Sequence, residues 1–170
     1  RVGSKPILEH IINNAKAQGY KNFLIAINYL GEIIKNYFGD GKHFGVNIDY
    51  IEEKKYLGTF GALSLMVSKE EKPFLLMNGD LVANINFDEF VKFHKKQNGL
   101  LTLALRYHEY QNQYGVIKLN NYEVIDFKEK PLMKNYINAG FYVIEPGVLK
   151  YLQYNQYCDI PEIINKLKKH

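Results

Sequence analysis

The acidic residue with the clearest setting for chemistry is Asp80, which ends the stretch Pro73-Phe74-Leu75-Leu76-Met77-Asn78-Gly79-Asp80. Four consecutive large apolar residues, 74–77, are typical of a strand buried on both faces, as in a parallel sheet covered by helices. Asp80 follows the carboxyl end of that strand, where open α/β sheets bind ligands, so its carboxylate is a candidate metal or substrate contact. Taken alone, Asn78-Gly79-Asp80 is better explained as a plain turn, because all three residue types favour turns.

A second candidate for ligand binding is the glycine-spaced turn Leu57-Gly58-Thr59-Phe60-Gly61-Ala62. Its glycines would let the backbone approach a ligand closely, and Thr59 is a candidate cap for an apolar helix running to about Val67. Lys54 and Lys55 supply positive charge just before it. A single Gly-x-x-Gly turn is common, so a plain loop is the favoured interpretation until other motifs are considered.

The elements that must position these residues alternate between helices and buried strands, which predicts one compact α/β domain. Ser4 is a candidate N-cap for the first helix, and Asn86 for the helix after Asp80. His94 is expected to be a surface or hydrogen-bonded helix histidine, because no second histidine stands three or four residues away. From Arg106 onward, short strands and aromatic turns predict a smaller lobe or β-extension that closes a cleft. The expected helices are 6–19, 29–38, 87–97, 146–152 and 160–168, and the expected strands are 22–28, 46–51, 74–77, 100–107, 114–117, 124–127 and 136–144.

Composition narrows the classes of protein. The 170 residues are 46% hydrophobic and 24% charged, which fits one globular domain. No apolar run is long enough to span a bilayer, and residues 1–6 lack a signal-peptide core, so we expect a cytoplasmic protein without a membrane partner. The single cysteine, Cys158, agrees with a reducing compartment and is expected to serve packing. A net charge of +4 with scattered lysines argues against nucleic acid but suits small polyanions such as nucleotides and sugar phosphates.

Six motifs, in order, carry a family resemblance that no single one provides. The series closely resembles the sugar-1-phosphate nucleotidylyltransferases, also called NDP-sugar pyrophosphorylases, over essentially the whole chain. The resemblance implies a Rossmann-like mixed, mostly parallel sheet with helices on both faces and a small β-extension. It also implies transfer of a nucleotidyl group from a nucleoside triphosphate to a sugar 1-phosphate, with Mg²⁺ assistance and release of pyrophosphate. The motifs are Lys5-Pro6-Ile7-Leu8, Leu57-Gly58-Thr59-Phe60-Gly61-Ala62, Asn78-Gly79-Asp80, Tyr114-Gly115-Val116, Glu129-Lys130-Pro131 and Asn138-Ala139-Gly140.

The resemblance also implies a role for each motif. Asp80 would be the magnesium ligand, and Lys130 would hold the sugar phosphate near in-line geometry. Glu129 would accept hydrogen bonds from sugar hydroxyls. Residues implied to bind the nucleotide are Leu57, Gly58, Thr59, Gly61 and Gly79. Residues implied to bind the sugar phosphate are Gly115, Glu129, Lys130, Asn138 and Gly140.

Two family features do not fall within residues 1–170. One is the first strand with its Gly-x-Gly-Thr-Arg loop, and the other is a later tryptophan-aspartate motif that supplies a second metal ligand. Asp159 is not that ligand, since it matches a position before a helix. We therefore interpret residues 1–170 as a single nucleotidyltransferase domain truncated at both ends, and expect two unpaired strand edges, at 23–28 and 74–77. Such edges are filled by an upstream segment or by a partner strand, which leaves a homo-oligomer open.

Alternatives remain open for the chemistry. A glycosyltransferase that uses a nucleotide sugar would carry an Asp-x-Asp metal motif, whereas Leu81 and Val82 follow Asp80. A non-catalytic, nucleotide-sensing member of the family is the third interpretation, and the retained Asp80, Glu129 and Lys130 argue against it. The glycine turn most resembles the guanylyl branch, so we expect GTP with a hexose or heptose 1-phosphate.

Overall fold

A computed structural model of the protein describes residues 3–66 and 70–168. The chain forms two compact units. Unit 1 consists of residues 1–102 and 142–170, and unit 2 consists of residues 103–141. The β-extension expected from Arg106 onward corresponds closely to unit 2.

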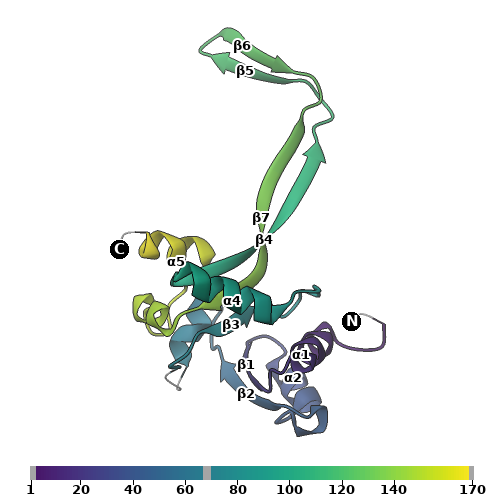
Figure 1. The fold of residues 1–170 in the computed structure, drawn as a ribbon, viewed down its shortest axis with the longest axis vertical. Helices are drawn as coiled ribbons and strands as arrows, with labels where there is room; N and C mark the ends of the chain where they lie inside the picture. Colours follow the sequence, from purple (N-terminus) through teal and green to yellow (C-terminus); the bar gives the residue numbers. More distant parts are fainter. Residues whose placement is uncertain (1–2, 67–69, 169–170) are drawn as a thin grey trace. The chain divides into compact units, whose positions relative to one another are not determined.

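The elements of unit 1 alternate between helices and strands, as the apolar pattern predicts (Figure 1). Strands β4 (Leu101–Gln111) and β7 (Leu132–Ile144) each have residues in both units, and β5 (Val116–Asn120) and β6 (Glu123–Lys128) belong to unit 2. The remaining elements are α1 (Ile7–Ala17), β1 (Asn22–Ile27), α2 (Gly31–Phe38), η1 (Lys42–Phe44), β2 (Asn47–Glu52), α3 (Gly58–Gly61), η2 (Ala62–Leu65), β3 (Phe74–Met77), α4 (Phe87–Gln97), η3 (Pro146–Tyr151) and α5 (Ile160–Leu167), where η denotes a 3₁₀ helix.

The described strands form three sheets. Strands β1 and β2 are parallel, with Asn22 opposite Asn47 and Ile27 opposite Glu52. A second sheet has the order β3-β7-β4, and β5 and β6 form an antiparallel pair. The mixed α/β class is therefore confirmed. Within the described residues β1 pairs only with β2 and β3 only with β7, so each has one unpaired edge, as expected.

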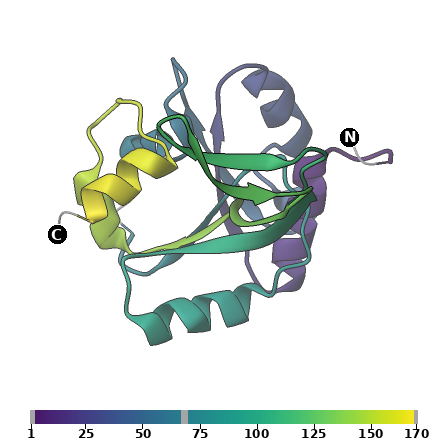
Figure 2. The ribbon, with the colours of Figure 1, turned by 90° about the horizontal axis from the view of Figure 1, so that it is seen from above.

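Apolar stripes on the helices pack the sheets of unit 1. Ile12 of α1 and Phe38 of α2 form a buried cluster with Ile48 of β2 and with Val46, which directly precedes that strand. Figure 2 shows α1 and α2 near β1 and β2, at the N-terminal side of the unit. Burial of such side chains is the main source of stability for this half of the unit.

A buried histidine joins α4 to the second sheet. The ring of His94 is fully buried, with Nδ1 2.8 Å from Oγ1 of Thr102 in β4 and Nε2 3.1 Å from Oε1 of Glu145 after β7. An ionised carboxylate only accepts, so Nε2–H donates to Glu145, and the Thr102 hydroxyl donates to Nδ1 when the ring is neutral. His94 is thus the hydrogen-bonded helix histidine that the sequence predicts. No cluster of three metal-ligating side chains occurs among the described residues.

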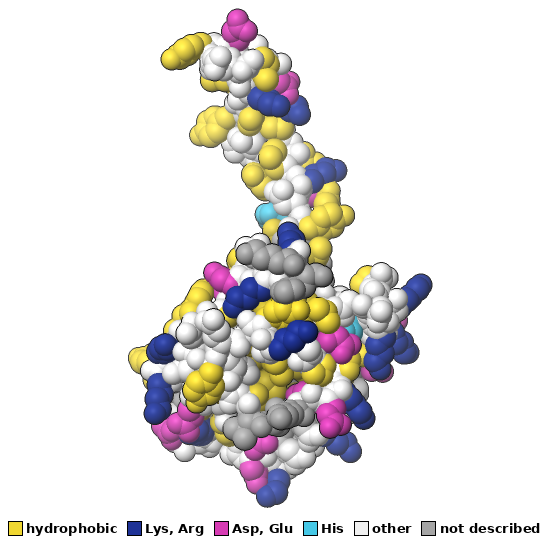
Figure 3. All heavy atoms as spheres, turned by 90° about the vertical axis from the view of Figure 1, so that its left-hand side faces the viewer, with side chains coloured by type: hydrophobic (Ala, Val, Ile, Leu, Met, Phe, Trp, Pro, Cys, Tyr) yellow, Lys and Arg dark blue, Asp and Glu magenta, His cyan; other side chains and the backbone are white. Residues whose placement is uncertain are grey.

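Unit 2 buries little of its apolar surface. Every residue of β5 and β6 is exposed, and so are the first seven of β7. In the antiparallel pair of β5 and β6, Ile117 lies opposite Phe127 and Leu119 lies opposite Val124. Lys118 lies opposite Asp126. Figure 3 shows hydrophobic side chains over much of the visible surface of this unit.

Local details of several helices differ from the sequence predictions. Helix α1 begins at Ile7 with Pro6 in the N-cap position, so Ser4 is not the cap. The helix predicted to start at the glycine turn is only the short α3 followed by the 3₁₀ helix η2, and Thr59 lies inside α3 rather than capping it. The predicted end of that helix, Val67, lies outside the described residues. Residues 146–151 form a 3₁₀ helix.

Two predicted helix starts are confirmed. The side chain of Asn86 accepts a hydrogen bond from the Glu89 N–H at the start of α4. Asp159 caps α5 through a capping box with Glu162, so it precedes a helix, as its sequence position indicates.

No helix of the described residues is long and apolar enough to cross a membrane.

An ion pair at the start of α1 makes stability depend on pH. The buried carboxylate of Glu9 contacts Nζ of Lys5 at 2.7 Å and accepts a hydrogen bond from the Tyr37 hydroxyl at 2.7 Å. The hydrogen bond from Lys5, followed by that from Tyr37, lowers the pKa of Glu9. A lowered carboxyl pKa stabilises the fold above the unfolded-state pKa, and this contribution is lost as pH falls through the folded-state value.

We therefore expect Glu9→Gln to lower the melting temperature at neutral pH. The difference from the unsubstituted protein should shrink as pH falls below about 4.5, the range in which an unfolded glutamate takes up its proton. Thermal melting followed by circular dichroism from pH 3 to 7 measures it. Glu32→Gln is the matched control, because Glu32 is an exposed acid on α2. A pH-independent difference for Glu9→Gln would contradict the assignment.

Candidate functional site

Asp80 lies in the turn that follows β3. Both Gly79 and Asp80 are exposed, and the Asp80 carboxylate makes no hydrogen bond or ion pair with another described residue. The four residues of β3 are only half-buried, although their sequence is typical of a fully buried strand. The carboxylate is therefore delivered to the end of the strand as predicted, and it is accessible to a ligand.

The glycine turn is tied to another segment of unit 1. The N–H groups of Phe60 and Gly61 both donate to the Cys158 carbonyl, at 3.0 and 2.9 Å, and the Cys158 N–H donates to the Leu57 carbonyl at 2.9 Å. Gly58 has a φ of +76°, which only glycine adopts easily. A Cβ atom on Gly61 would lie 2.6 Å from the Gln156 carbonyl oxygen.

These contacts assign a packing role to the turn's glycines. Two of its N–H groups are already satisfied by Cys158, so they are not free donors for phosphate oxygens. Burial raises the pKa of the Cys158 thiol, in keeping with the packing role predicted for that residue. Thr59 is half-buried in α3. The other residues of the turn, Leu57, Gly58, Phe60 and Gly61, are buried.

The candidate sugar site lies in unit 2. A Cβ atom on Gly115 would lie 2.6 Å from Cζ of Phe127 and 3.0 Å from Oε2 of Glu129, so the absence of a side chain lets both groups sit against the backbone. The sequence therefore brings together two of its predicted site residues, Gly115 and Glu129. Both are exposed, which leaves the carboxylate accessible to a hydroxyl-rich ligand.

Lys130 follows directly, in an unusual conformation. Its φ is +42°, in the left-handed region that costs a residue with a side chain about 1 kcal/mol or more. Its carbonyl accepts a hydrogen bond from Nε2 of Gln111, and the Pro131 carbonyl accepts one from the Asn112 N–H at 3.0 Å. The surrounding backbone thus holds a strained lysine beside Glu129, and such strain is frequent at functional positions.

The third pair of predicted sugar-site residues lies in β7. Oδ1 of Asn138 accepts a hydrogen bond from the Gly140 N–H at 3.0 Å, and Gly140 has a φ of +72°. Gly140 lies where the continuous strand β7 passes from the exposed residues 132–138 to the buried residues 140–144. The side chain of Asn138 is thereby oriented by the backbone two residues further on.

The structure thus groups the predicted residues by unit. Unit 1 holds the predicted nucleotide and metal residues, and unit 2 holds the predicted sugar residues. Within unit 2, Gly115 contacts Glu129 and Asn138 contacts Gly140. Within unit 1, no hydrogen bond or ion pair joins Asp80 to the glycine turn among the described residues.

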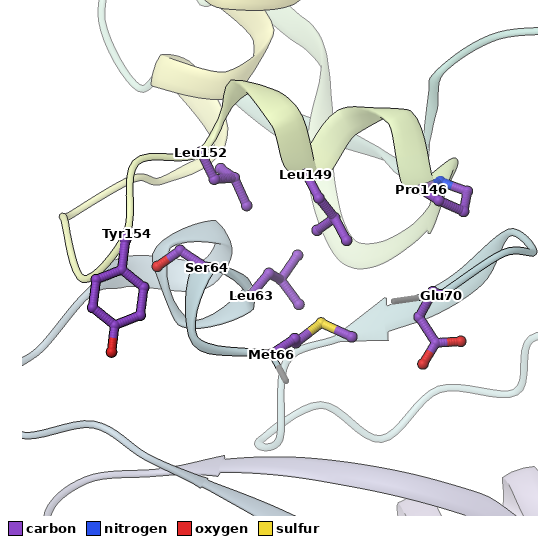
Figure 4. Close-up of a pocket in the computed structure, with 8 residues that line it drawn as sticks. All are labelled: Leu63, Ser64, Met66, Glu70, Pro146, Leu149, Leu152 and Tyr154. Carbon is purple, nitrogen blue, oxygen red and sulfur yellow. The ribbon is translucent and has the colours of Figure 1, made fainter. Parts of the chain in front are cut away.

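Sequence analysis missed a pocket of about 400 Å³ in unit 1 (Figure 4). Of its polar lining residues, Ser64 is already hydrogen-bonded, because its Oγ donates to the Gly61 carbonyl at 2.6 Å and accepts from the Asn155 N–H at 3.0 Å. The lining is mainly apolar and contains no predicted site residue; the only sequence signal was apolar spacing after Pro146. The lining residues are Leu63, Ser64, Met66, Glu70, Pro146, Leu149, Leu152 and Tyr154.

The chain belongs to the nucleotidyl transferase family, whose model matches residues 1–169. The expected membership among the sugar-1-phosphate nucleotidylyltransferases is confirmed by similarity to curated relatives. The chain is 35% identical over 158 residues to the mannose-1-phosphate guanyltransferase of Yarrowia lipolytica, covering 86% of this chain and 43% of that protein. It is 33% identical over 159 residues to the enzyme of the same name from Hypocrea jecorina, covering 88% and 44%. The chain thus spans less than half the length of these relatives.

Solved structures confirm the fold. A Bacillus anthracis structure provisionally assigned as a glucose-1-phosphate thymidylyltransferase matches with a TM-score of 0.73 at 22% identity, covering 99% of this chain and 72% of that one. HddC from Yersinia pseudotuberculosis, complexed with GMP-PN, matches with a TM-score of 0.66 at 18% identity, covering 92% and 70%.

The packing role of the turn gives a stability prediction. We expect Gly61→Ala to lower the free energy of unfolding by about 1–3 kcal/mol, because its methyl group would collide with the backbone at Gln156. Chemical denaturation measures the change. Gly147→Ala is the matched control, since nothing lies within 4 Å of a Cβ there. Equal stability of the two variants would show that the close approach is not required.

Proposed function

We propose that the full-length protein containing these residues transfers the guanylyl group of GTP to a hexose or heptose 1-phosphate and releases pyrophosphate. Family membership and similarity to mannose-1-phosphate guanyltransferases support the guanylyl donor and the sugar-phosphate acceptor. The observation that carries the proposal is the packing of Glu129 against Gly115, with the strained Lys130 beside it. Glu129, whose carboxylate can accept hydrogen bonds from hydroxyl groups, and Lys130, whose ammonium can bind phosphate, are therefore consecutive residues of unit 2.

The reaction would be an in-line displacement at the α-phosphorus of the nucleotide. A phosphate oxygen of the sugar 1-phosphate forms a new P–O bond to the α-phosphorus. The bond from that phosphorus to pyrophosphate breaks, and the pyrophosphate leaves with the electron pair of the bond. Lys130 would hold the acceptor phosphate, and Glu129 would accept hydrogen bonds from sugar hydroxyls. Because no covalent enzyme intermediate is needed, positioning and charge neutralisation would supply most of the catalysis.

The residues present fit a magnesium ion that is shared with the nucleotide. Mg²⁺ in such sites takes one or two carboxylates together with phosphate oxygens, and Asp80 is an exposed carboxylate without a partner among the described residues. When bound there, Mg²⁺ would neutralise negative charge on the phosphates during attack. Asp80 is the residue of this chain that would hold it.

Asp80→Ala tests this role in the full-length protein. We expect kcat/KM for pyrophosphate release to fall about 100-fold or more, because the phosphates would lose the carboxylate that fixes their counterion. A coupled pyrophosphate assay with GTP and mannose 1-phosphate measures it. Asp49→Ala, which removes an exposed aspartate of β2, should leave activity unchanged. Unchanged activity of Asp80→Ala would remove the metal role.

The same assay separates the alternative chemistry. A glycosyltransferase would release nucleoside diphosphate from a nucleotide sugar, whereas the proposed enzyme releases pyrophosphate from a triphosphate. A nucleotide-sensing member would bind GTP and release neither product.

The proposal includes a cytoplasmic location, which the single, buried Cys158 supports.

We further propose that residues 1–170 alone do not catalyse the reaction. The unpaired edge and half-buried side chains of β3 leave the strand that carries Asp80 without a neighbour on one side. The purified 170-residue chain should therefore release no pyrophosphate above background from Mg²⁺, GTP and mannose 1-phosphate. Measurable turnover that scales with the concentration of this chain would refute the prediction.

A further inference from the structure

Two exposed tyrosines flank the glycine turn. Tyr56 directly precedes the Leu57–Gly61 turn and is 70% exposed, and Tyr157 is 52% exposed. Their ring centroids are 5.9 Å apart at an interplanar angle of 52°. A Cβ atom on Gly58 would lie 3.0 Å from Cε2 of Tyr157, so this ring rests against the turn itself.

The backbone hydrogen bonds of the turn hold Tyr157 in place. Cys158, the next residue, bonds to Leu57, Phe60 and Gly61 through its N–H and carbonyl groups. The Tyr157 hydroxyl also lies 3.5 Å from Oδ2 of Asp159, a residue fixed as the cap of α5. The backbone bonds of Cys158 and the hydroxyl contact with Asp159 therefore hold the Tyr157 ring in place, while about half of the residue stays exposed to solvent.

Charges of both signs lie near the rings. Lys54 and Lys55 are exposed and precede Tyr56 directly, and neither forms an ion pair within the described residues. Desolvation, followed by the nearby carboxylates of Asp159 and Glu162, raises the pKa of Tyr157, and the Glu53 carboxylate accepts a hydrogen bond from the Leu57 N–H at 3.0 Å. Aromatic rings beside free cations are the combination that binds a base and its phosphates together.

We propose that Tyr56 and Tyr157 form an aromatic platform on which the base of the nucleoside triphosphate stacks, with Lys54 and Lys55 attracting its phosphates. The inference rests on the proposed function and adds residues to its nucleotide side. It also explains how a turn whose N–H groups are occupied takes part in binding: the turn holds the rings, and the rings hold the base.

The test compares two ligands that differ by the base and its ribose. Equilibrium dialysis of the full-length protein measures binding of GTP and of inorganic tripolyphosphate, with Mg²⁺. The Tyr56→Leu/Tyr157→Leu double variant should bind GTP roughly 5- to 100-fold more weakly and bind tripolyphosphate unchanged, since only stacking is lost. The Lys54→Gln/Lys55→Gln double variant should bind both GTP and tripolyphosphate more weakly. Tyr122→Leu, which removes a fully exposed tyrosine of the hairpin turn, is the matched control.

Conservative variants guard against misfolding. Tyr56→Phe/Tyr157→Phe keeps both rings and should bind GTP as the unsubstituted protein does. Unchanged GTP affinity in the leucine double variant would overturn the platform, and so would an equal loss of GTP and tripolyphosphate binding. If that variant changed only self-association, measured by sedimentation, the rings would serve a protein contact instead, which also overturns the platform.

The platform and the proposed function fail separately. Tyrosine-dependent GTP binding without pyrophosphate release would retain the platform and refute the transferase. Pyrophosphate release with a KM for GTP unaffected by the leucine double variant would retain the transferase and refute the platform.

Discussion

The backbone link between the Leu57–Gly61 turn and Cys158 is the constraint on which the candidate nucleotide site of this protein depends. It joins two segments that lie far apart in the sequence, and it requires a glycine at position 61 because the Gln156 carbonyl occupies the space of a side chain. The start of α5 follows at once, with Asp159 capping it. Turn, tyrosine ring and helix cap are thus fixed by one short stretch of backbone.

A second constraint acts on the other sheet. His94 connects α4, β4 and the end of β7 through two hydrogen bonds made by one buried ring. A buried polar group without a hydrogen-bond partner lowers the stability of the fold. Thr102 and Glu145 therefore both satisfy the two ring nitrogens of His94 and fix the orientation of its ring. The strand β7, which supplies the candidate sugar residues Asn138 and Gly140, is therefore anchored at its buried end.

Sequence reasoning succeeded where the signal is local. Apolar runs located β1 and β3, and the side chain of Asn86 indicated where α4 begins, because strand burial and capping depend on neighbouring residues. It failed where a distant partner decides. Nothing near Gly61 indicates that the Cys158 carbonyl will accept a hydrogen bond from its N–H group, and the apolar spacing after Pro146 does not by itself reveal the pocket beside η3. The motif residues Gly115 and Glu129 were found by family resemblance, and only coordinates reveal that they touch.

The left-handed glycine at position 140 bears on how the sequence of β7 can vary. Side chains alternate between the two faces of a strand, so inserting one residue ordinarily moves every later residue to the opposite face. An insertion or deletion in β7 would therefore be disruptive, because the strand is continuous from Leu132 to Ile144 across the left-handed Gly140. Exchange of side chains at the exposed residues 132–138 leaves the buried residues 141–144 in place. One strand thus carries an exposed segment that is free to vary and a buried segment that is not.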